Sequence, residues 1–390
     1  MSPKKRILLV NTYLTASGGG NLVAAYIIEA IKNKCSISTL SWAPAELDAM
    51  NHTFGTSILP SETSVYSAPI LLRILVKFIP FLSPIKYAIL LRICKKIRCE
   101  YDIIIGLNNE ADFGFRGIQY IHDPPYWLST PRNRRQLSVK QKLRFINNLW
   151  AVFKGKYRPW MFIAGFSYDR MRKNLTLVNS NWTRKHIATS YGIKSVCVNP
   201  PASGFFPNLP WEERENGFVC IGRIIPWKLF EKIIEIINTV RSEIQNVHLH
   251  IIGIIDEHRY YQQLLQQVQT SPWISLHTNI SKEELIKLIV RHRYGIHAMK
   301  NEPFGIAVAE MVRGGCIVFV PPNGGPMEIV GGDIRLLYET TEEAVRKILH
   351  VMKSHDEQVS LRTFLDSRKE LFSPENFILS IQQIIKQFSK

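Results

Sequence analysis

The sequence predicts an α/β protein of two doubly wound domains, each a parallel sheet covered by helices on both faces. Its 390 residues, 46% apolar and 21% charged, are enough for two well-packed domains. Short Val/Ile-rich runs alternate with helical patterns, which is typical of buried parallel strands. Residues 200–217, rich in Pro, Gly and Asn, indicate a break between domains over 1–205 and 206–373. A last helix over 374–390 could pack on either domain and would complete the N-terminal one.

The strands are predicted where apolar runs are bounded by polar or turn residues, and the helices where apolar residues recur every three or four positions. In the N-terminal domain the strands are 6–10, 101–107, 116–122, 175–180 and 195–200, with a helix over 20–34. In the C-terminal domain the strands are 217–223, 247–253, 273–278, 294–299 and 316–322, with helices over 226–244, 258–270 and 281–293. In such open sheets, ligands bind at the carboxyl ends of the strands, so a cleft between the domains is expected.

Cysteine usage indicates the cellular compartment, and the distribution of charge indicates the kind of partner. Six cysteines are scattered without C-x-x-C spacing, and the N-terminus lacks a signal-peptide cleavage pattern, so we expect a cytosolic protein without disulfides. Residues 1–210 hold 28 Lys and Arg against 10 Asp and Glu, whereas the rest holds 21 against 22. The basic first half indicates a polyanionic partner, either an acidic membrane or a nucleic acid.

Two segments could bind phosphate. Gly18, Gly19 and Gly20 lie between a predicted strand and helix, where backbone amides approach an anion closely, although a tight turn without a ligand is an equal alternative. Arg223 and Lys228 follow a strand in "CIGRIIPWK" and would neutralise a diphosphate. The alternative for these two is a pair of solvated surface cations.

The segment "KNEPFGIAVAEMVRGGCIVFVPPNGGP" predicts a third anion site. A helix beginning near Gly305 would direct the amides of Gly305, Ile306 and Ala307 into the cleft. Glu302 precedes this helix, and Glu310 lies about one and a half turns inside it. A carboxylate buried there needs partners, which the hydroxyls of a ribose or a salt bridge would supply.

Together, Arg223-x4-Lys228, the two glutamates in "EPFGIAVAE" and the N-terminal glycine loop resemble the retaining, GT-B-fold glycosyltransferases of family 4. The segments "NSNWTRKHI", "VNPPASGFF" and "GIAVAEMVRGGCIVFVPPNGGPMEIV" are similar to the branch that contains the α1,2-mannosyltransferases of lipid-linked oligosaccharide assembly. That branch often carries Glu-Arg after the glycine loop, where this chain has Asn21-Leu22.

The resemblance implies a GT-B fold and a nucleotide-diphosphate sugar as donor, with GDP-mannose favoured and a UDP-sugar of polysaccharide or glycolipid synthesis as the alternative. The implied site residues are Gly18, Gly19, Gly20, Gly305, Ile306, Ala307, Arg223 and Lys228 for the diphosphate, Glu310 for the ribose, and Glu302 and His122 beside the transferred sugar. His122 as a general base, or as a purely structural residue, remains open.

The sequence has no D-x-D pair and no His/Cys/Asp cluster at metal-ligand spacing, so no metal is expected, and cations and helix N-termini would meet the charge of the leaving diphosphate. Retention by double displacement would require a carboxylate nucleophile. The resemblance instead implies same-face attack, with the leaving phosphate oxygen taking the acceptor proton and Glu302 orienting the sugar.

Segments 66–100 and 132–175 mix long apolar runs with regularly spaced Lys and Arg, which favours contact with an anionic membrane at the cytoplasmic face and a glycan or lipid-linked acceptor. The alternative is that both are ordinary helices whose apolar faces are core. A non-catalytic sugar-nucleotide binder and a basic nucleic-acid- or membrane-binding protein are the rival classes. No nucleic-acid-binding motif is present, so nucleic acid is not an expected partner.

Overall fold

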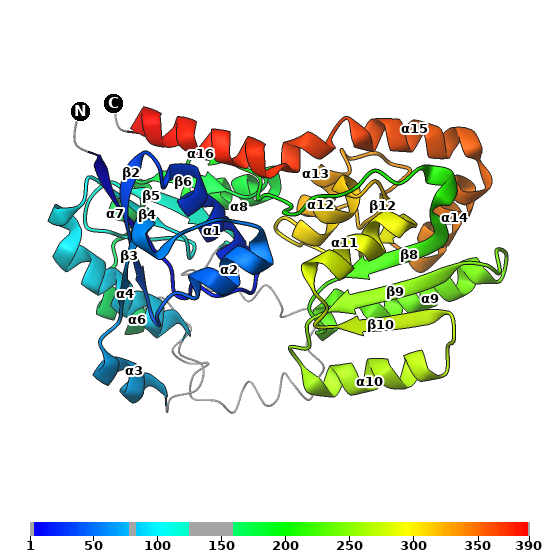
Figure 1. The fold of residues 1–390 in the computed structure, drawn as a ribbon, viewed down its shortest axis with the longest axis horizontal. Helices are drawn as coiled ribbons and strands as arrows, with labels where there is room; N and C mark the ends of the chain where they lie inside the picture. Colours follow the sequence, from blue (N-terminus) through cyan, green and yellow to red (C-terminus); the bar gives the residue numbers. More distant parts are fainter. Residues whose placement is uncertain (1–3, 78–82, 125–158, 389–390) are drawn as a thin grey trace.

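A computed structural model describes residues 4–77, 83–124 and 159–388, which form two parallel sheets (Figure 1). The first sheet has seven strands in the order β3-β2-β1-β4-β5-β6-β7. They are β1 (Lys5–Val10), β2 (Cys35–Ser41), β3 (Thr63–Ser67), β4 (Ile103–Gly106), β5 (Ile118–Ile121), β6 (Leu175–Val178) and β7 (Ser195–Cys197). The order reverses between β1 and β4, and this switch point opens a crevice at the carboxyl ends of the strands.

Strands β2 and β3 are not among the predicted strands. The sequence of β2, "CSISTLS", holds four Ser or Thr residues, so it lacks the apolar run that marks the other strands, yet all but one of its residues are buried. The sequence of β3, "TSVYS", lies at the edge of the sheet and is mostly exposed. Strand β2 takes its place by pairing with β1, and β3 by pairing with β2. A search for apolar runs detects neither pairing.

Helices cover both faces of this sheet. They are α1 (Gly19–Ile31), α2 (Leu47–Phe54), α3 (Ile70–Lys77), α4 (Ser83–Ile97), α6 (Pro159–Ala164), α7 (Tyr168–Arg172) and α8 (Asn181–Tyr191). Nine of the 13 residues of α1 are buried, in the core that contains Ile7 and Leu9. Helix α4 packs on the other face, where Tyr87 and Leu91 join Leu8 in a second core.

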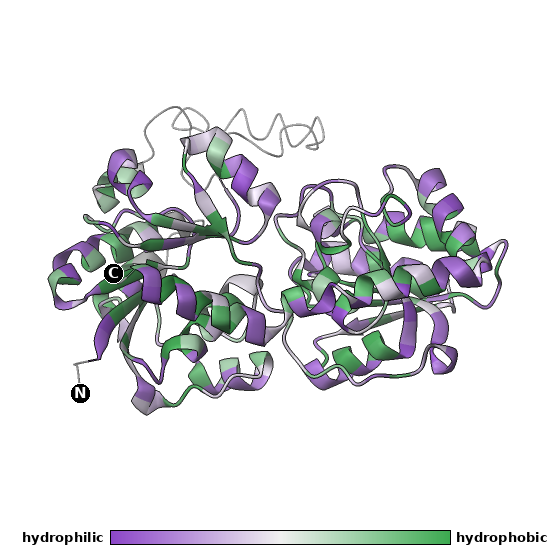
Figure 2. Ribbon diagram, turned by 90° about the horizontal axis from the view of Figure 1, so that it is seen from above, coloured by the Kyte–Doolittle hydropathy of each residue, from purple (hydrophilic) through white to green (hydrophobic). Residues whose placement is uncertain are grey.

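The second sheet has five parallel strands in the order β10-β9-β8-β11-β12. They are β8 (Glu215–Ile221), β9 (His248–Gly253), β10 (Ile274–Thr278), β11 (His292–Ile296) and β12 (Ile317–Phe319). The helices are α9 (Phe230–Arg241), α10 (His258–Gln269), α11 (Lys282–Arg291), α12 (Ile306–Arg313), α13 (Gly325–Ile329), α14 (Thr341–Lys353) and α15 (His355–Asp366). Right-handed crossovers place α9 and α10 on one face of the sheet and α11 and α12 on the other. Hydrophobic residues line the inner faces of these layers and hydrophilic residues the outer faces (Figure 2).

The last helix, α16 (Pro374–Phe388), crosses back to the N-terminal sheet and packs beside α1, with Gln382 donating a hydrogen bond of 2.8 Å to the carbonyl of Ala30 (Figure 1). Two facing doubly wound units with helices on both faces are the GT-B architecture, which confirms the predicted fold class.

Candidate functional site

A pocket of about 300 Å³ lies between the two sheets, beside the loops that leave β1, β8 and β9. The N-terminal domain contributes Gly18, Gly19 and Leu22 from the loop and first turn of α1. The C-terminal domain contributes Arg223, Ile306, Glu310 and residues of the segments 252–254 and 279–282. Five of the predicted site residues therefore line one pocket: Gly18, Gly19, Arg223, Ile306 and Glu310.

The glycine loop packs closely against the opposite domain. Gly18 caps α1 in a backbone conformation with φ of 84°, which favours glycine. A Cβ on Gly19 would lie 2.5 Å from Cδ1 of Ile306, and one on Gly20 would lie 3.7 Å from Nε2 of His122. Glycine at these positions lets the loop approach both α12 and His122.

Asn21 fixes the shape of this loop. Its amide nitrogen donates to Oγ1 of Thr15 at 2.9 Å and to the carbonyl of Ser17 at 2.8 Å, and its oxygen accepts from Nδ2 of Asn11 at 3.1 Å. In the branch that the chain resembles, this position often carries glutamate. Here a neutral amide holds the loop and adds no negative charge to it.

The predicted helix after Gly305 begins at Ile306, as α12. Gly305 is its N-cap, with φ of 97°, and Ile306 lines the pocket. The first amides of a helix have no partner within it, and the helix dipole makes its N-terminus electropositive. The N-termini of α1 and α12 thus meet at the pocket from the two domains.

Glu302 forms the most densely paired charge of the site. Nζ of Lys228 lies 2.9 and 2.8 Å from its two carboxylate oxygens, and Nε2 of His297 lies 2.7 Å from Oε2. Burial raises the pKa of the Glu302 carboxyl, but the charges of Lys228 and His297 outweigh burial, so the pKa lies well below its usual value of 4.5. Glu302 is therefore ionised at neutral pH.

The glycine pair Gly324 and Gly325 supports the backbone of Glu302. The amide of Gly325 donates to the carbonyl of Glu302 at 2.8 Å. A Cβ on Gly325 would lie 2.3 Å from Cα of Phe304, and one on Gly324 would lie 2.6 Å from the Glu302 carbonyl. This pair holds the loop that carries Glu302.

Glu310 and Arg223 also have ion partners. Glu310 is 7% exposed and pairs with Lys282, so the salt bridge considered from the sequence is present. Arg223 pairs with Asp256 at 2.8 Å, and its side chain is 64% exposed, so it can reorient at little cost. Lys228 extends along Gly222, whose added Cβ would lie 3.1 Å from Cδ of the lysine, and Gly222 lines the pocket.

His122 lies at the carboxyl end of β5. Its Nε2 lies 3.1 Å from the carbonyl of Leu107, which can only accept, so this nitrogen carries the proton. Burial lowers the pKa of His122 to about 4, and the bond to Leu107 opposes this shift only in part. His122 is therefore neutral at physiological pH.

The N-terminus of α8 joins the two domains next to Glu302. Oγ of Ser180 donates to the carbonyl of Pro303 at 2.5 Å, and Nε1 of Trp182 donates to Asn323 at 2.9 Å. The carboxylate of Glu328 accepts from the amides of Asn181, at 2.8 Å, and Trp182. A carboxylate from one domain thus caps a helix of the other.

Three residues of the site are not among the predicted ones: Asn21, Lys282 and His297. Asn21 and Lys282 each lie next to or within a segment already singled out as loop or helix start. His297 follows a buried strand, "YGIHAM", where a lone histidine has no distinguishing spacing, so only the fold shows that it meets Glu302.

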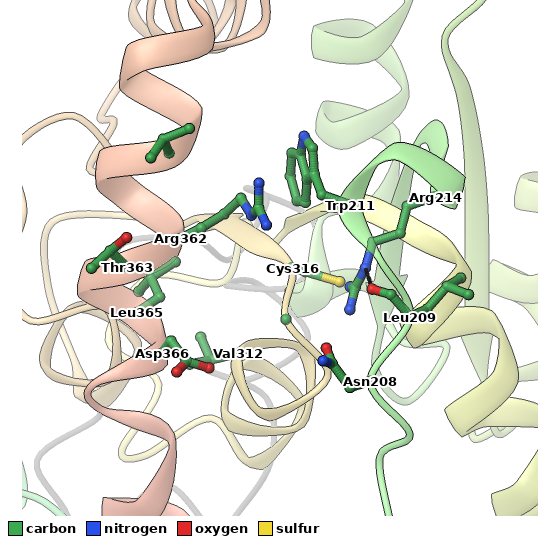
Figure 3. A pocket seen from close by; sticks show the side chains of 12 residues that line it. Asn208, Leu209, Trp211, Arg214, Val312, Cys316, Arg362, Thr363, Leu365 and Asp366 are labelled. Atoms are coloured by element: carbon green, nitrogen blue, oxygen red, sulfur yellow. Dashed lines mark hydrogen bonds between the residues drawn. The ribbon is translucent and has the colours of Figure 1, made fainter.

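A second pocket, of about 330 Å³, lies behind α12, between the segment 208–214 and α15 (Figure 3). The guanidinium of Arg362 stacks on Trp211 at 4.6 Å from its centroid, and Arg214 donates to the carbonyl of Leu209 at 3.1 Å. None of the predicted site residues lines this pocket. Within the described ranges, no helix combines the length and hydropathy that a membrane span requires.

The fold and the site define a GT-B protein with its candidate active site between two Rossmann-like domains. Residues 204–364, which lie in the C-terminal domain, match the family model of the glycosyl transferases group 1. The resemblance stated from the sequence motifs is confirmed at this level.

Curated relatives share the name GDP-Man:Man(3)GlcNAc(2)-PP-Dol alpha-1,2-mannosyltransferase. The human protein is 26% identical over 56% of this chain and 49% of its own length, and the mouse protein is 27% identical over 68% and 59%. The chain thus spans about half the length of the curated relatives it matches. Among solved structures, sucrose-phosphate synthase from Thermosynechococcus elongatus aligns with a TM-score of 0.70 at 14% identity, over 99% of both chains. Anabaena Alr3699/HepE in complex with UDP and glucose aligns at 0.65 and 15%, over 98% of this chain and 99% of its own.

Proposed function

We propose that this protein is a retaining glycosyltransferase of family 4 that transfers mannose from GDP-mannose to a lipid-linked glycan at an anionic membrane surface, without a metal at the donor. The observation that carries the proposal is the pocket in which Gly18 and Gly19 of one domain face Arg223, Ile306 and Glu310 of the other. The names of the curated relatives favour GDP-mannose as donor and a diphosphate-linked glycan as acceptor.

The donor diphosphate would lie between the N-termini of α1 and α12. Amides of the glycine loop and of residues 305–307 would donate to its oxygens, because both helix ends are electropositive. Lys228 stands beside Gly222 at the pocket, and Arg223 can leave the exposed Asp256 for a stronger bidentate contact with phosphate. These groups would stabilise the negative charge that develops on the leaving diphosphate.

Glu310 would bind the ribose. Its carboxylate is buried and held by Lys282, which fixes its position at the pocket wall. An ionised carboxylate accepts from two neighbouring hydroxyl groups, as the 2′- and 3′-hydroxyls of a ribose present them. The residues that would distinguish guanine from uracil are not specified by this contact.

Glu302 would orient the sugar and would not attack it. Ion pairs with Lys228 and His297 stabilise the negative charge of Glu302 and make its oxygens poor nucleophiles. The ionised carboxylate can still accept hydrogen bonds from sugar hydroxyls. The acceptor hydroxyl oxygen would bond to the anomeric carbon on the face from which the phosphate oxygen departs. Its proton would pass to that phosphate oxygen, and the configuration would be retained. Burial lowers the pKa of His122 to about 4, so its imidazole is a weak base and suits contact with the donor better than proton abstraction.

Membrane contact would be made by α3. Four of its apolar side chains are more than half exposed: Ile70, Leu71, Ile74 and Leu75, at 62, 72, 51 and 66%. The next helix, α4, exposes Arg92 and Lys96, and residues 1–210 carry the whole net positive charge of the chain. An apolar face beside cations is suited to the headgroup region of an anionic bilayer. Residues 132–158 of the second segment considered for this role lie outside the described residues.

Thermal unfolding with a donor panel tests the donor. GDP-mannose at about 100 times its dissociation constant should stabilise the protein by about 2.7 kcal/mol, and UDP-glucose should not. The shift should vanish in Glu310→Ala and persist in Glu235→Ala, a control on the exposed side of α9. A thermal shift with UDP-glucose but not with GDP-mannose would identify a UDP-sugar as the donor. If no sugar nucleotide shifts the unfolding temperature, the transferase proposal is overturned.

Transfer and membrane binding need their own assays. NMR of the product formed on a lipid-linked glycan should show an α-mannoside without added metal and in the presence of EDTA; a β-mannoside would refute retention. Vesicles with anionic lipids should sediment the wild type but not the Leu71→Asp/Leu75→Asp variant, while the thermal shift with donor is unchanged. Equal sedimentation of both proteins would refute the role of α3.

A further inference from the structure

Four potential metal ligands converge at the edge of the C-terminal sheet that lies opposite the donor pocket. Glu215, His248 and His292 are the first residues of β8, β9 and β11, and His250 lies two positions along β9. One ligand atom from each lies within 4.8 Å of all the others. We infer that this His–Glu cluster is a structural binding site for a transition metal dication, most simply Zn²⁺.

The distances within the His–Glu cluster fit a tetrahedral ion. Nε2 of His248 lies 2.9 Å from Nε2 of His292 and 3.2 Å from Oε2 of Glu215, and the remaining pair is 3.5 Å apart. Ligands placed tetrahedrally at about 2.0–2.1 Å from zinc are separated by about 3.3–3.4 Å. The three atoms thus already lie close to the spacing of a zinc triad, and His250 supplies the fourth position.

Hydrogen bonds to the outer atoms point the lone pairs inward. Nδ1 of His292 lies 2.6 Å from the carbonyl of Leu288, so it donates there and leaves Nε2 as an acceptor. The other oxygen of Glu215 pairs with Arg291, and Nδ1 of His250 lies 2.8 Å from Nε2 of His277. Contacts of this kind orient ligands in metal sites.

The sheet also makes room for the cluster. Gly217 of β8 pairs with His248 in the register, and a Cβ on Gly217 would lie 2.3 Å from Nε2 of that histidine. The glycine lets the imidazole ring lie across the sheet toward Glu215. Without an ion, His248 can direct one Nε2 proton toward either Glu215 or His292, whereas a cation satisfies both acceptors at once.

The position of the cluster distinguishes it from the catalytic site. It joins the amino ends of three neighbouring strands, whereas the donor pocket lies at their carboxyl ends. Glu215 and His248 are 34 and 27% exposed and would admit the ion, and His292 is 1% exposed and anchors it. A bound metal would stabilise the C-terminal sheet and would leave donor chemistry metal-independent, as proposed above.

Zinc binding to the purified full chain tests the inference. After dialysis against EDTA, competition with a chromophoric chelator should show about one Zn²⁺ per chain, and the His258→Gln control, on exposed α10, should match it. His248→Gln should weaken binding more than about 100-fold, and His277→Gln, which alters only the orienting contact, by about 10–100-fold. Absence of stoichiometric zinc, or equal affinity in wild type and both variants, would overturn the site.

Cobalt substitution reports the geometry without reference to activity. One equivalent of Co²⁺ should give the intense visible absorption of a four-coordinate ion in the wild type and lose it in His248→Gln. A weak, octahedral spectrum in the wild type would contradict the proposed ligand set. The metal-free wild type and variants should unfold at similar temperatures, and if His248→Gln does not fold, the partly exposed His277 supplies the decisive variant.

Discussion

The pair of Glu302 and Lys228 offers a sharp test of the site's electrostatics. Both side chains are mostly buried, 18 and 11% exposed, and Nζ contacts both carboxylate oxygens. We consider Glu302→Leu, Lys228→Met and the double variant. Each single change leaves one buried charge without its main partner, whereas the double change replaces the pair by apolar side chains.

The expected magnitudes follow from burial. Removing one partner of a buried ion pair costs about 3–5 kcal/mol, whereas replacing the whole pair is often neutral or stabilising. We expect Glu302→Leu to lower the free energy of unfolding by about 3 kcal/mol. Lys228→Met should cost less, because His297 still contacts the carboxylate. The double variant should recover most of the loss.

Urea unfolding followed by circular dichroism measures these differences. The exposed pair of Lys353 and Glu243 is the control, with an expected coupling below about 1 kcal/mol. A double variant whose loss equals the sum of the two single losses would refute the coupling.

The pair also predicts a pH dependence. The pKa of Glu302 in the folded protein is lowered below 4.5, its value in the unfolded chain. The ionised carboxylate therefore contributes to the free energy of unfolding above pH 4.5, and this contribution is lost as the pH falls toward the pKa of the folded state. The double variant should lack this acid-induced loss. Unfolding curves recorded below pH 4.5 that coincide for wild type and double variant, apart from a constant offset, would contradict the assignment.

Three further perturbations test the surroundings of the site. Gly325→Ala should destabilise the protein by about 1–3 kcal/mol in thermal unfolding, because the added Cβ would clash with the backbone of Phe304. Gly20→Ala should leave the stability of the protein unchanged and weaken donor binding. Equal stabilities of the two variants would refute the close packing at Gly325. Glu328→Ala removes the acceptor of the Asn181 and Trp182 amides of α8 and leaves the N-cap Ser180 in place. It should cost about 1 kcal/mol and broaden the particle in X-ray scattering, and an unchanged scattering profile would contradict a role of Glu328 in joining the two domains. Between pH 6.5 and about 4, His122 is protonated in the unfolded chain and neutral in the folded protein. The free energy of unfolding therefore decreases as the pH is lowered through this range, by up to about 1.4 kcal/mol per pH unit. His122→Gln should reduce this slope.

The parts of the fold that follow from the sequence are those with local signals. Buried strands such as β4 and β8 are continuous apolar runs, and the start of α12 is marked by Gly305. The edge strand β3 is polar and exists because β2 offers it partners. The sequence places Glu302 and Glu310 on one segment, but their partners Lys228 and Lys282 come from other elements.

The His–Glu cluster illustrates the same limit. The expectation of no metal-ligand cluster was based on spacing along the chain. Only the "HLH" of β9 gives a local signal, since alternate residues of a strand share a face. Glu215 and His292 join it through strand order, because β8 lies between β9 and β11. No local pattern contains that information.

Helix α16 has a consequence for biosynthesis. Its Phe377, Ile381, Ile384 and Ile385 belong to the same core as Ile7 and Leu9 of β1. During translation, the apolar face of α1 that α16 covers would therefore stay exposed to solvent until the entire C-terminal domain has left the ribosome. A chain of this arrangement depends on chaperones, or on early folding of its second domain, for longer than two independent domains would.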